Sequence, residues 1–248
     1  SRFTCFSAVI ITTSAAAPAW WITSSLEKVH LHETPPAAPV RAATISAQQG
    51  EIEAFQLHLV LPAGAPPVVA AAPNVSGLPA HVTTDWRKVV HVWCNKSDIY
   101  PEASTAGWQP DALLDATYFV DSVPLEAELV HSFWIRLHVG AGAAPGSSHP
   151  ELHLRVGAEA LTVPIQLTVW PIALPPMNKR YGTIFNLFYR SDQDGATDLA
   201  KYYGGTLPES VKRAYFALLC EAGVPADDPY IQKLRPLEDY KLLAACGG

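Results

Sequence analysis

Apolar and polar residues alternate with a period of two through much of the chain between residues 20 and 172. In one run Phe55 and Leu57 lie on one face, and Gln56 and His58 lie on the other. Alternation of this kind predicts half-buried β-strands, because successive side chains of a strand point to opposite faces. The same alternation recurs in three further runs, residues 133–139, 152–156 and 161–169.

Turn-forming segments rich in Gly, Ala and Pro separate these runs, for example residues 63–67 and 140–146. No amphipathic helix interrupts the series, and short strands joined by such turns are typical of a sandwich. We therefore predict a mainly β fold with an antiparallel β-sandwich over residues 20–172. The buried residues of this sandwich should include Phe55, Leu57, Phe133, Ile135, Val163 and Ile165.

The character of the chain changes at the proline-rich connector 171–176, where we expect a domain boundary. Residues 183–189 form a dense apolar run, as expected for a strand of a parallel sheet that is covered on both faces. Thr206 and Glu209 have the spacing of a helix capping box, and Gly223 is a stop signal. A second helical stretch follows at residues 237–245.

This order of strand and helices predicts that residues 177–248 are the first elements of an incomplete, truncated β/α (TIM-barrel-like) domain. A complete barrel takes about 250 residues. An incomplete barrel leaves apolar surface uncovered, and such surface favours association. We therefore expect self-association or a partner through residues 180–248.

Residues 1–19 admit two interpretations. The stretch is apolar and almost uncharged, which fits the remnant of a secretory leader, and residues 8–11 would equally fit an ordinary first strand. Asn74 and Asn95 begin glycosylation triplets that matter only on a eukaryotic secretory route. No run reaches the ~18 apolar residues of a membrane span. We expect a secreted or extracellular protein without a membrane span.

Charge and cysteine content narrow the function classes. The chain has 17 basic and 23 acidic residues, a net charge of −6, and no block of Lys and Arg. Nucleic acid is therefore not expected as a partner. The four cysteines form no CxxC pair, which argues against a structural zinc site. They allow three full disulfide pairings, and buried free thiols are the alternative for Cys94 and Cys220.

Several motifs occur in an order that resembles a known family. They comprise residues 21–29, 50–56 (Gly-Glu-Ile-Glu-Ala-Phe-Gln), 108–114, 133–135, 144–146 and 163–170 (Val-Pro-Ile-Gln-Leu-Thr-Val-Trp). On these motifs the chain resembles glycoside hydrolase family 123 and the bacterial proteins that carry the domain of unknown function 4091. The resemblance covers about residues 20–190. It implies an N-terminal β-sandwich before a (β/α)8 barrel, hydrolysis of N-acetylgalactosaminides, and carbohydrate as the ligand.

The catalytic residues of that family have no counterpart here. Its adjacent Asp-Glu pair lies well into the barrel, whereas the adjacent acids of this chain, 227–228 and 238–239, lie in a loop and at the start of the last helix. Glu51 and Glu53 share one face of a strand, and we interpret them as a solvent-facing or ion-paired stripe. We therefore predict no catalytic residue in this chain and leave open whether it is an enzyme.

Trp108 is the main candidate for contact with a sugar. It follows Gly107 and precedes Pro110, so we expect an exposed aromatic platform in a loop. Asn186, Tyr189 and Arg190, on and just after the expected strand 183–189, are further candidates for substrate binding. Most of the other tryptophans should fill the core or an interdomain seam, Trp170 especially.

Four histidines on the expected strands, His30, His32, His138 and His153, alternate with apolar residues as a polar outer face would. No third or fourth ligand can be named beside them, so we expect no metal site and no cofactor.

Two functions remain at this point. The first is the sandwich domain and barrel start of a glycoside hydrolase-like protein, a scaffold that docks on a barrel and is inactive alone. The second is a secreted β-sandwich module that binds glycans or proteins without catalysis.

Overall fold

The computed structural model describes residues 17–95, 106–119, 122–175 and 208–221. The chain divides into two compact units, Ser1–Ala173 and Leu174–Gly248. In the second unit the description covers helix α3 (Glu209–Glu221), where Arg213 Nε donates to Glu209 Oε1 at 3.1 Å. The strand expected at 183–189, the helix at 237–245 and the leader or strand at the N-terminus all lie outside the described residues.

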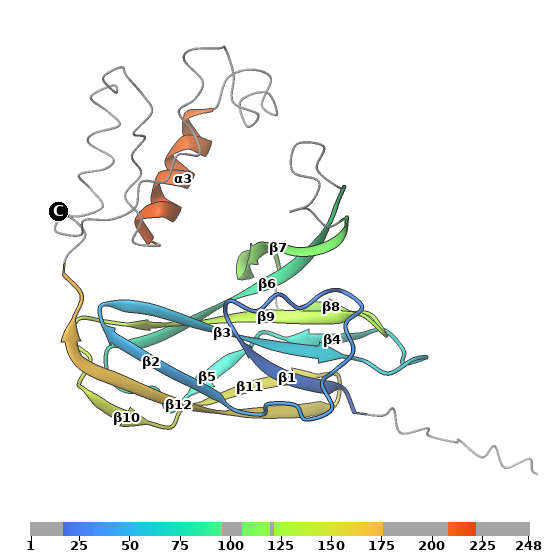
Figure 1. Cartoon of the computed structure of the whole chain (residues 1–248), viewed down its shortest axis with the longest axis horizontal. Coiled ribbons are helices and arrows are strands. Elements are labelled where there is room, and N and C mark those ends of the chain that lie inside the picture. The colour runs from blue at the N-terminus through green and yellow to red at the C-terminus, as the bar shows by residue number, and fades with distance from the viewer. Residues whose placement is uncertain (1–16, 96–105, 120–121, 176–207, 222–248) are drawn as a thin grey trace, which may run out of the picture. The chain divides into compact units, whose positions relative to one another are not determined.

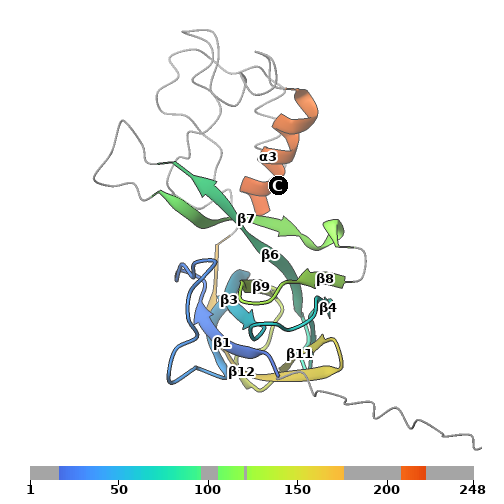
Figure 2. The same ribbon diagram turned by 90° about the vertical axis from the view of Figure 1, so that its right-hand side faces the viewer.

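The first unit is a sandwich of two sheets (Figures 1 and 2), so the predicted mainly β fold is confirmed. One sheet has five strands, which in spatial order are β1 (Ala19–Ser24), β3 (Glu51–Val60), β9 (Val130–Val139), β6 (Val82–Cys94) and β7 (Gly107–Asp115). A 3-10 turn, η1 (Ala116–Tyr118), follows β7.

The other sheet has seven strands. Its main path runs through β10 (Gly146–Ser148), β12 (Glu159–Ala173), β11 (Glu151–Val156), β4 (Val68–Ala71) and β8 (Ser122–Leu125), while β2 (Ala43–Gln49) pairs with β12 and β5 (Asn74–Ser76) pairs with β11.

The core lies between the inward faces of the two sheets. All six residues predicted to be buried are inside it, with Leu57, Phe133 and Val163 fully inaccessible. The alternation of apolar residues in β9, β11 and β12 places one face of each strand in this core, which is why the period of two identified them. Among the described residues no helix is long and apolar enough to span a membrane.

The strand β3 departs from the half-buried prediction, because Gln56 and His58 on its outer face are also buried. The segment after β1 covers this face. Gln56 Nε2 donates to the carbonyl oxygens of Ser24 and Glu27, at 3.0 and 2.7 Å. A second apolar cluster of Trp21, Val29 and Val130 completes the cover. The alternation gave the correct inward face, but it could not show that a loop would cover the outward one.

One strand pair is parallel where the sequence predicted antiparallel pairing throughout. β2 runs parallel to β12, with Ile45 opposite Leu167. β2 then passes into β3 of the other sheet through the single residue Gly50, whose φ of 83° lies in the left-handed region. The Glu51 carboxylate accepts a hydrogen bond from Gln48 N at 2.6 Å across this corner.

The tryptophans are less buried than expected. Trp21 and Trp86 lie in apolar clusters, whereas Trp93 and Trp170 are exposed by 58 and 49%. Trp108, which was predicted to be exposed, is exposed by 43%. Trp170 therefore does not fill the core of the sandwich. It follows the inward-facing Val169 on β12 and points the other way, as the alternation of that strand requires.

Candidate functional site

The strand β6 pairs with two partners in turn, and this places part of it beyond the neighbouring strand. Its first residues, from Val82 to Val89, pair with β9, and residues from Arg87 to Cys94 pair with β7. The last residues of β6 and the first residues of β7 therefore form a two-stranded ribbon at the edge of the five-stranded sheet (Figure 2).

Two exposed tryptophans face each other on this ribbon. Trp93 and Trp108 are directly opposite in the register, and their rings meet edge to face with centroids 5.7 Å apart. Trp93 Nε1 donates to Asn95 Oδ1 at 3.1 Å, and His30 Nδ1 lies 3.4 Å from the carbonyl oxygen of Trp108. Their exposed faces give the ribbon an aromatic surface of the kind that stacks on sugar rings.

A bulge in the same ribbon sets the direction of the side chains beside it. Val90 pairs with Ala112 but His91 pairs with Pro110, so Asp111 is an extra residue on β7. Pro110 cannot donate a ladder hydrogen bond, and proline in a strand is commonly found at a bulge. The bulge separates Trp108 from Leu114, and both side chains line the same pocket.

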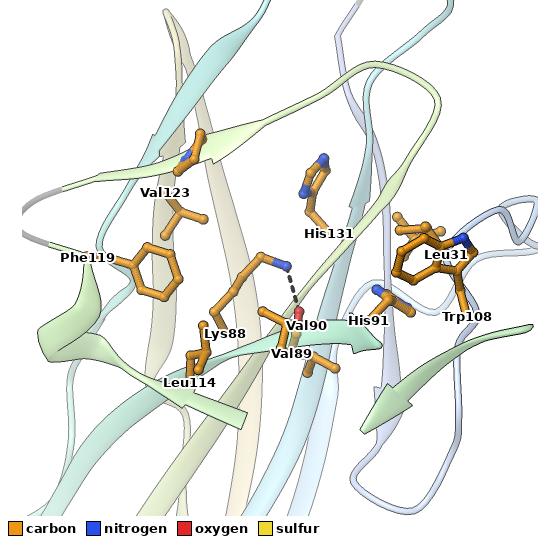
Figure 3. Close-up of a pocket in the computed structure, with 12 residues that line it drawn as sticks. Leu31, Lys88, Val89, Val90, His91, Trp108, Leu114, Phe119, Val123 and His131 are labelled. Carbon is orange, nitrogen blue, oxygen red and sulfur yellow. Dashed lines mark hydrogen bonds between the residues drawn. The ribbon is translucent and has the colours of Figure 1, made fainter. Parts of the chain in front are cut away.

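The pocket is a mostly apolar hollow of about 280 Å³ between this ribbon, the start of β9 and the strand β8 (Figure 3). Its described lining contains no Asp or Glu. The lining residues are Leu31, Lys88, Val89, Val90, His91, Trp108, Leu114, Phe119, Val123, Pro124, Val130 and His131.

Lys88 is the least expected residue of this lining. It is only 6% exposed, and its Nζ donates to the carbonyl oxygen of Val89 at 2.9 Å (Figure 3). Nζ also donates to the carbonyl oxygen of Ser132 at 3.4 Å. Nζ also lies 5.7 Å from the ring centroid of Phe133. Among the described residues no carboxylate contacts it. Burial lowers the pKa of the Lys88 ammonium to about 7.

Two histidines line the pocket with Lys88. His91 Nε2 donates to the carbonyl oxygen of Val29 at 3.1 Å, and His131 Nε2 accepts from Glu126 N at 2.9 Å. Burial, followed by the charge of Lys88, lowers the pKa of His131 to about 4. Burial also lowers the pKa of His91, and the charge of Lys88 adds to the effect. Both rings are therefore neutral at pH 7.

A third histidine, His58, does not line the pocket but contacts Ser132, whose carbonyl oxygen accepts from Lys88. Its Nδ1 lies 2.7 Å from Ser132 Oγ and its Nε2 lies 2.8 Å from Thr23 Oγ1. A serine beside a histidine suggests a nucleophile and its base. Ser132 is only 1% exposed and does not line the pocket, and a threonine occupies the place of the orienting acid. We therefore assign this network to satisfying buried polar groups.

The structure describes some of the residues predicted from the sequence and not others. Trp108 lies in strand β7 and not in a loop, because Gly107 begins the strand and Pro110 sits at its bulge. Asn186, Tyr189 and Arg190 lie outside the described residues. Asn74, in β5, and Asn95 are both exposed. Cys94 is a half-buried free thiol.

The histidines considered for metal binding do not come together. Among the described residues no group of three or more His, Cys, Asp and Glu side chains could hold a metal ion. His138 Nε2 contacts Asp85 Oδ2 at 2.6 Å, and His153 Nε2 contacts Ser76 Oγ at 2.7 Å.

Glu51 and Glu53 are both half-buried at the start of β3. Burial, and then the charge of Glu51, raise the pKa of Glu53. Glu51 itself holds the corner before β3 through Gln48 N. Neither side chain lines the pocket.

The sequence analysis missed Lys88, His91, His131 and Trp93. Lys88 carried a usable signal, because it is in phase with Val82 and Trp86, two buried residues of the same strand. A lysine on the face of a strand whose other residues are buried and apolar indicates either a bend in the strand or a buried amine. His91 and Trp93 carried no such signal in the sequence, because their role depends on the bulge and on the partner strand.

The comparisons with known proteins show the fold. The chain resembles the structure of a family 123 glycoside hydrolase from Clostridium perfringens, an enzyme of glycolipid glycan hydrolysis, with a TM-score of 0.50 and 14% identity. The match covers 68% of this chain and 30% of the hydrolase chain. The chain therefore spans less than a third of that hydrolase, and at this identity the likeness shows a fold shared with part of it and nothing about activity.

A PapD-like domain of human CEP192 matches over 71% of this chain and all of that domain, with 13% identity and a TM-score of 0.30. A likeness this remote does not bear on function. No protein-family model matches the chain, and no curated protein matches its sequence.

Proposed function

We propose that the sandwich is the carbohydrate-contacting supporting domain of a glycoside hydrolase-like protein, and that Trp93 and Trp108 stack on the glycan. The observation that carries the proposal is the exposed, mutually oriented pair of indole rings beside the pocket. The fold shared with part of the family 123 hydrolase supports it. The substrate class that follows from the sequence resemblance is a glycan containing N-acetylgalactosamine, and the action of that hydrolase on glycolipid glycans is compatible with this class.

The described pocket fits a binding role better than a hydrolytic one. Glycoside hydrolysis ordinarily uses two carboxyl groups about 5 Å apart in retaining enzymes and further apart in inverting ones. The described lining has no carboxyl group, whereas aromatic side chains are present where a sugar could lie against them. The observation therefore favours a non-catalytic role for this part of the chain, either as a rim of a hydrolase cleft or as a glycan-binding module.

Glycan binding by the full chain tests the proposal. The ligands would be oligosaccharides ending in N-acetylgalactosamine, with binding followed by NMR and tryptophan fluorescence. Trp93→Ala and Trp108→Ala should each weaken binding by about tenfold, because loss of one stacking contact of about 1.4 kcal/mol has that effect. Trp170→Ala is the matched control, since Trp170 is similarly exposed but does not line the pocket. Equal losses in all three variants, or none in any, would contradict the proposal.

A further inference from the structure

Four basic side chains, Lys88, His58, His91 and His131, gather behind and along the pocket from strands β3, β6 and β9. The charge of Lys88 lowers the pKa of each of the three histidines. The charges that lower the pKa values of the three described histidines come from Lys88 and from other histidines, and burial alone lowers the pKa of Lys88. The cluster therefore lacks a counter-ion within the part of the chain that the structure describes.

A buried amine without a counter-ion is costly to charge, since desolvation is not repaid by an ion pair. Lys88 Nζ makes two hydrogen bonds to backbone carbonyl oxygens, at 2.9 and 3.4 Å. An ammonium group has three N–H donors, so one donor remains for a further acceptor. Because Lys88 lines the pocket, that acceptor can belong to a ligand.

The rest of the lining limits what the ligand can be. Leu31, Val130 and Leu114 make the walls largely apolar, and Trp108 adds an aromatic surface (Figure 3). Mostly apolar walls with a few convergent polar groups are typical of small-molecule sites. A volume of about 280 Å³ suits a small molecule and not a polymer.

We propose that this pocket binds a small organic carboxylate, whose oxygens accept hydrogen bonds from Lys88 Nζ and whose body packs against Leu31, Val130 and Trp108. The carboxylate supplies the counter-ion that the Lys88 ammonium lacks. The same chemistry occurs in apolar acids and in acidic sugars. Benzoate represents the first source and glucuronate the second.

This proposal does not rest on the glycan-binding function. Trp93 does not line the pocket, so Trp93→Ala should retain carboxylate binding. Lys88→Met should lose carboxylate binding and retain stacking of a neutral glycan on the tryptophan pair. The two proposals can therefore fail separately.

The test is isothermal titration calorimetry of the full chain with benzoate, glucuronate and the neutral analogues benzamide and methyl glucoside. At least one acid should bind at least about tenfold more tightly than its neutral analogue, as loss of a charge-assisted contact predicts. Lys88→Met should abolish that preference. Arg155→Met, which removes an exposed positive charge from the other sheet, should leave it unchanged.

The pH dependence of carboxylate binding tests the proposal on the parent chain alone, so it does not require that a variant folds. Lys88 has a pKa of about 7. His131 and His58 have pKa values of about 4 and about 3, so both rings are neutral above pH 5. The pKa of His91 is also lowered. Binding above pH 7 should therefore draw one proton to Lys88, and affinity should fall by up to about tenfold per pH unit. Equal binding of acids and neutral analogues, no binding of either acid, or binding without proton uptake at pH 8 would overturn the proposal.

Discussion

Asp85 and Arg136 lie directly opposite each other on β6 and β9 and form two hydrogen bonds of 2.7 Å, from Arg136 Nε and Nη2 to the two carboxylate oxygens. His138 Nε2 approaches the same carboxylate at 2.6 Å. Burial raises the pKa of Asp85, but the hydrogen bonds from Arg136 and His138 outweigh it and leave the pKa below its ordinary value. The pair ties the strand that leads to the pocket to the centre of the five-stranded sheet.

Asp85→Asn should lower the free energy of unfolding by about 1 kcal/mol, because a two-pronged contact is lost at a partly exposed site. The contribution should be present above pH ~3.8 and lost as pH falls through the lower pKa of the folded state. Urea denaturation at pH 7 and pH 3 measures both effects. Glu151→Gln is the control, since Glu151 and His153 are 3.9 Å apart and exposed, and it should cost less than about 0.5 kcal/mol. Equal costs for the two variants would contradict this account.

The pH dependence of stability should come partly from His58. Burial, then the charges of Lys88 and His91, lower its pKa to about 3, from an ordinary value of 6.5. The unfolded chain takes up a proton as pH falls below 6.5 while the folded chain does not, so stability present above pH 6.5 is lost on acidification. The slope from this group is about 1.4 kcal/mol per pH unit.

His58→Gln removes this titration while keeping polar atoms for Thr23 and Ser132. Urea denaturation at pH 6.5, 5.5 and 4.5 should therefore give a flatter dependence than in the parent chain. His131, with a pKa of about 4, should retain a second contribution of the same sign. An unchanged slope in His58→Gln would show that this ring is not the titrating group.

The sandwich could be predicted from the sequence because apolar residues occupy every second position in its core-facing strands. Phe133, Ile135 and Leu137 are all buried, and so are Leu57 and Phe55, the partners of Phe133 and Ile135 on β3. Burial of one face is a local property of each strand, and the alternation records it. The parallel β2–β12 pair could not be predicted in this way, since it depends on Gly50 directing the chain into the other sheet.

The site was less predictable for a related reason. Trp108 was identified by its flanking Gly107 and Pro110, but its partner Trp93 is a neighbour only across the ribbon. His91 and His131 come from different strands, β6 and β9, and both line the pocket. A pattern along one strand does not contain the register between two strands, and the register determines this pocket.

Lys88→Met should stabilise the chain. The pKa of Lys88 is about 7 in the folded state and 10.5 in its ordinary environment, so burying the charged amine costs most below pH 7 and nothing above pH 10.5. The advantage of the methionine variant should therefore be largest at and below pH 7. It should shrink by up to about 1.4 kcal/mol per pH unit above that.

Urea denaturation of the parent chain and of Lys88→Met at pH 6, 7, 8 and 9 measures the difference in their free energies of unfolding directly. Arg155→Met, at an exposed position, is the control for loss of a positive charge and should show a difference of less than about 0.5 kcal/mol throughout. A methionine variant that is less stable than the parent at pH 7 would show that the two backbone hydrogen bonds of Nζ outweigh its desolvation.

The described carboxylates should not hydrolyse a glycosidic bond. Glu51 and Glu53 are the pair that most resembles an acid and its partner, because they share a face and the pKa of Glu53 is raised by burial and by Glu51. Glu51 is nevertheless engaged with Gln48 N at 2.6 Å, and no described pocket residue is acidic. The described pocket therefore does not bring a substrate to both groups, as two-carboxylate hydrolysis requires. We expect the parent chain to release 4-nitrophenol from 4-nitrophenyl N-acetylgalactosaminide no faster than the blank reaction. Glu53→Gln and Glu51→Gln should give the same rate. Turnover by the parent chain that disappears in Glu53→Gln, while Glu151→Gln keeps it, would place a catalytic site at the start of β3 and contradict the supporting role proposed for the sandwich.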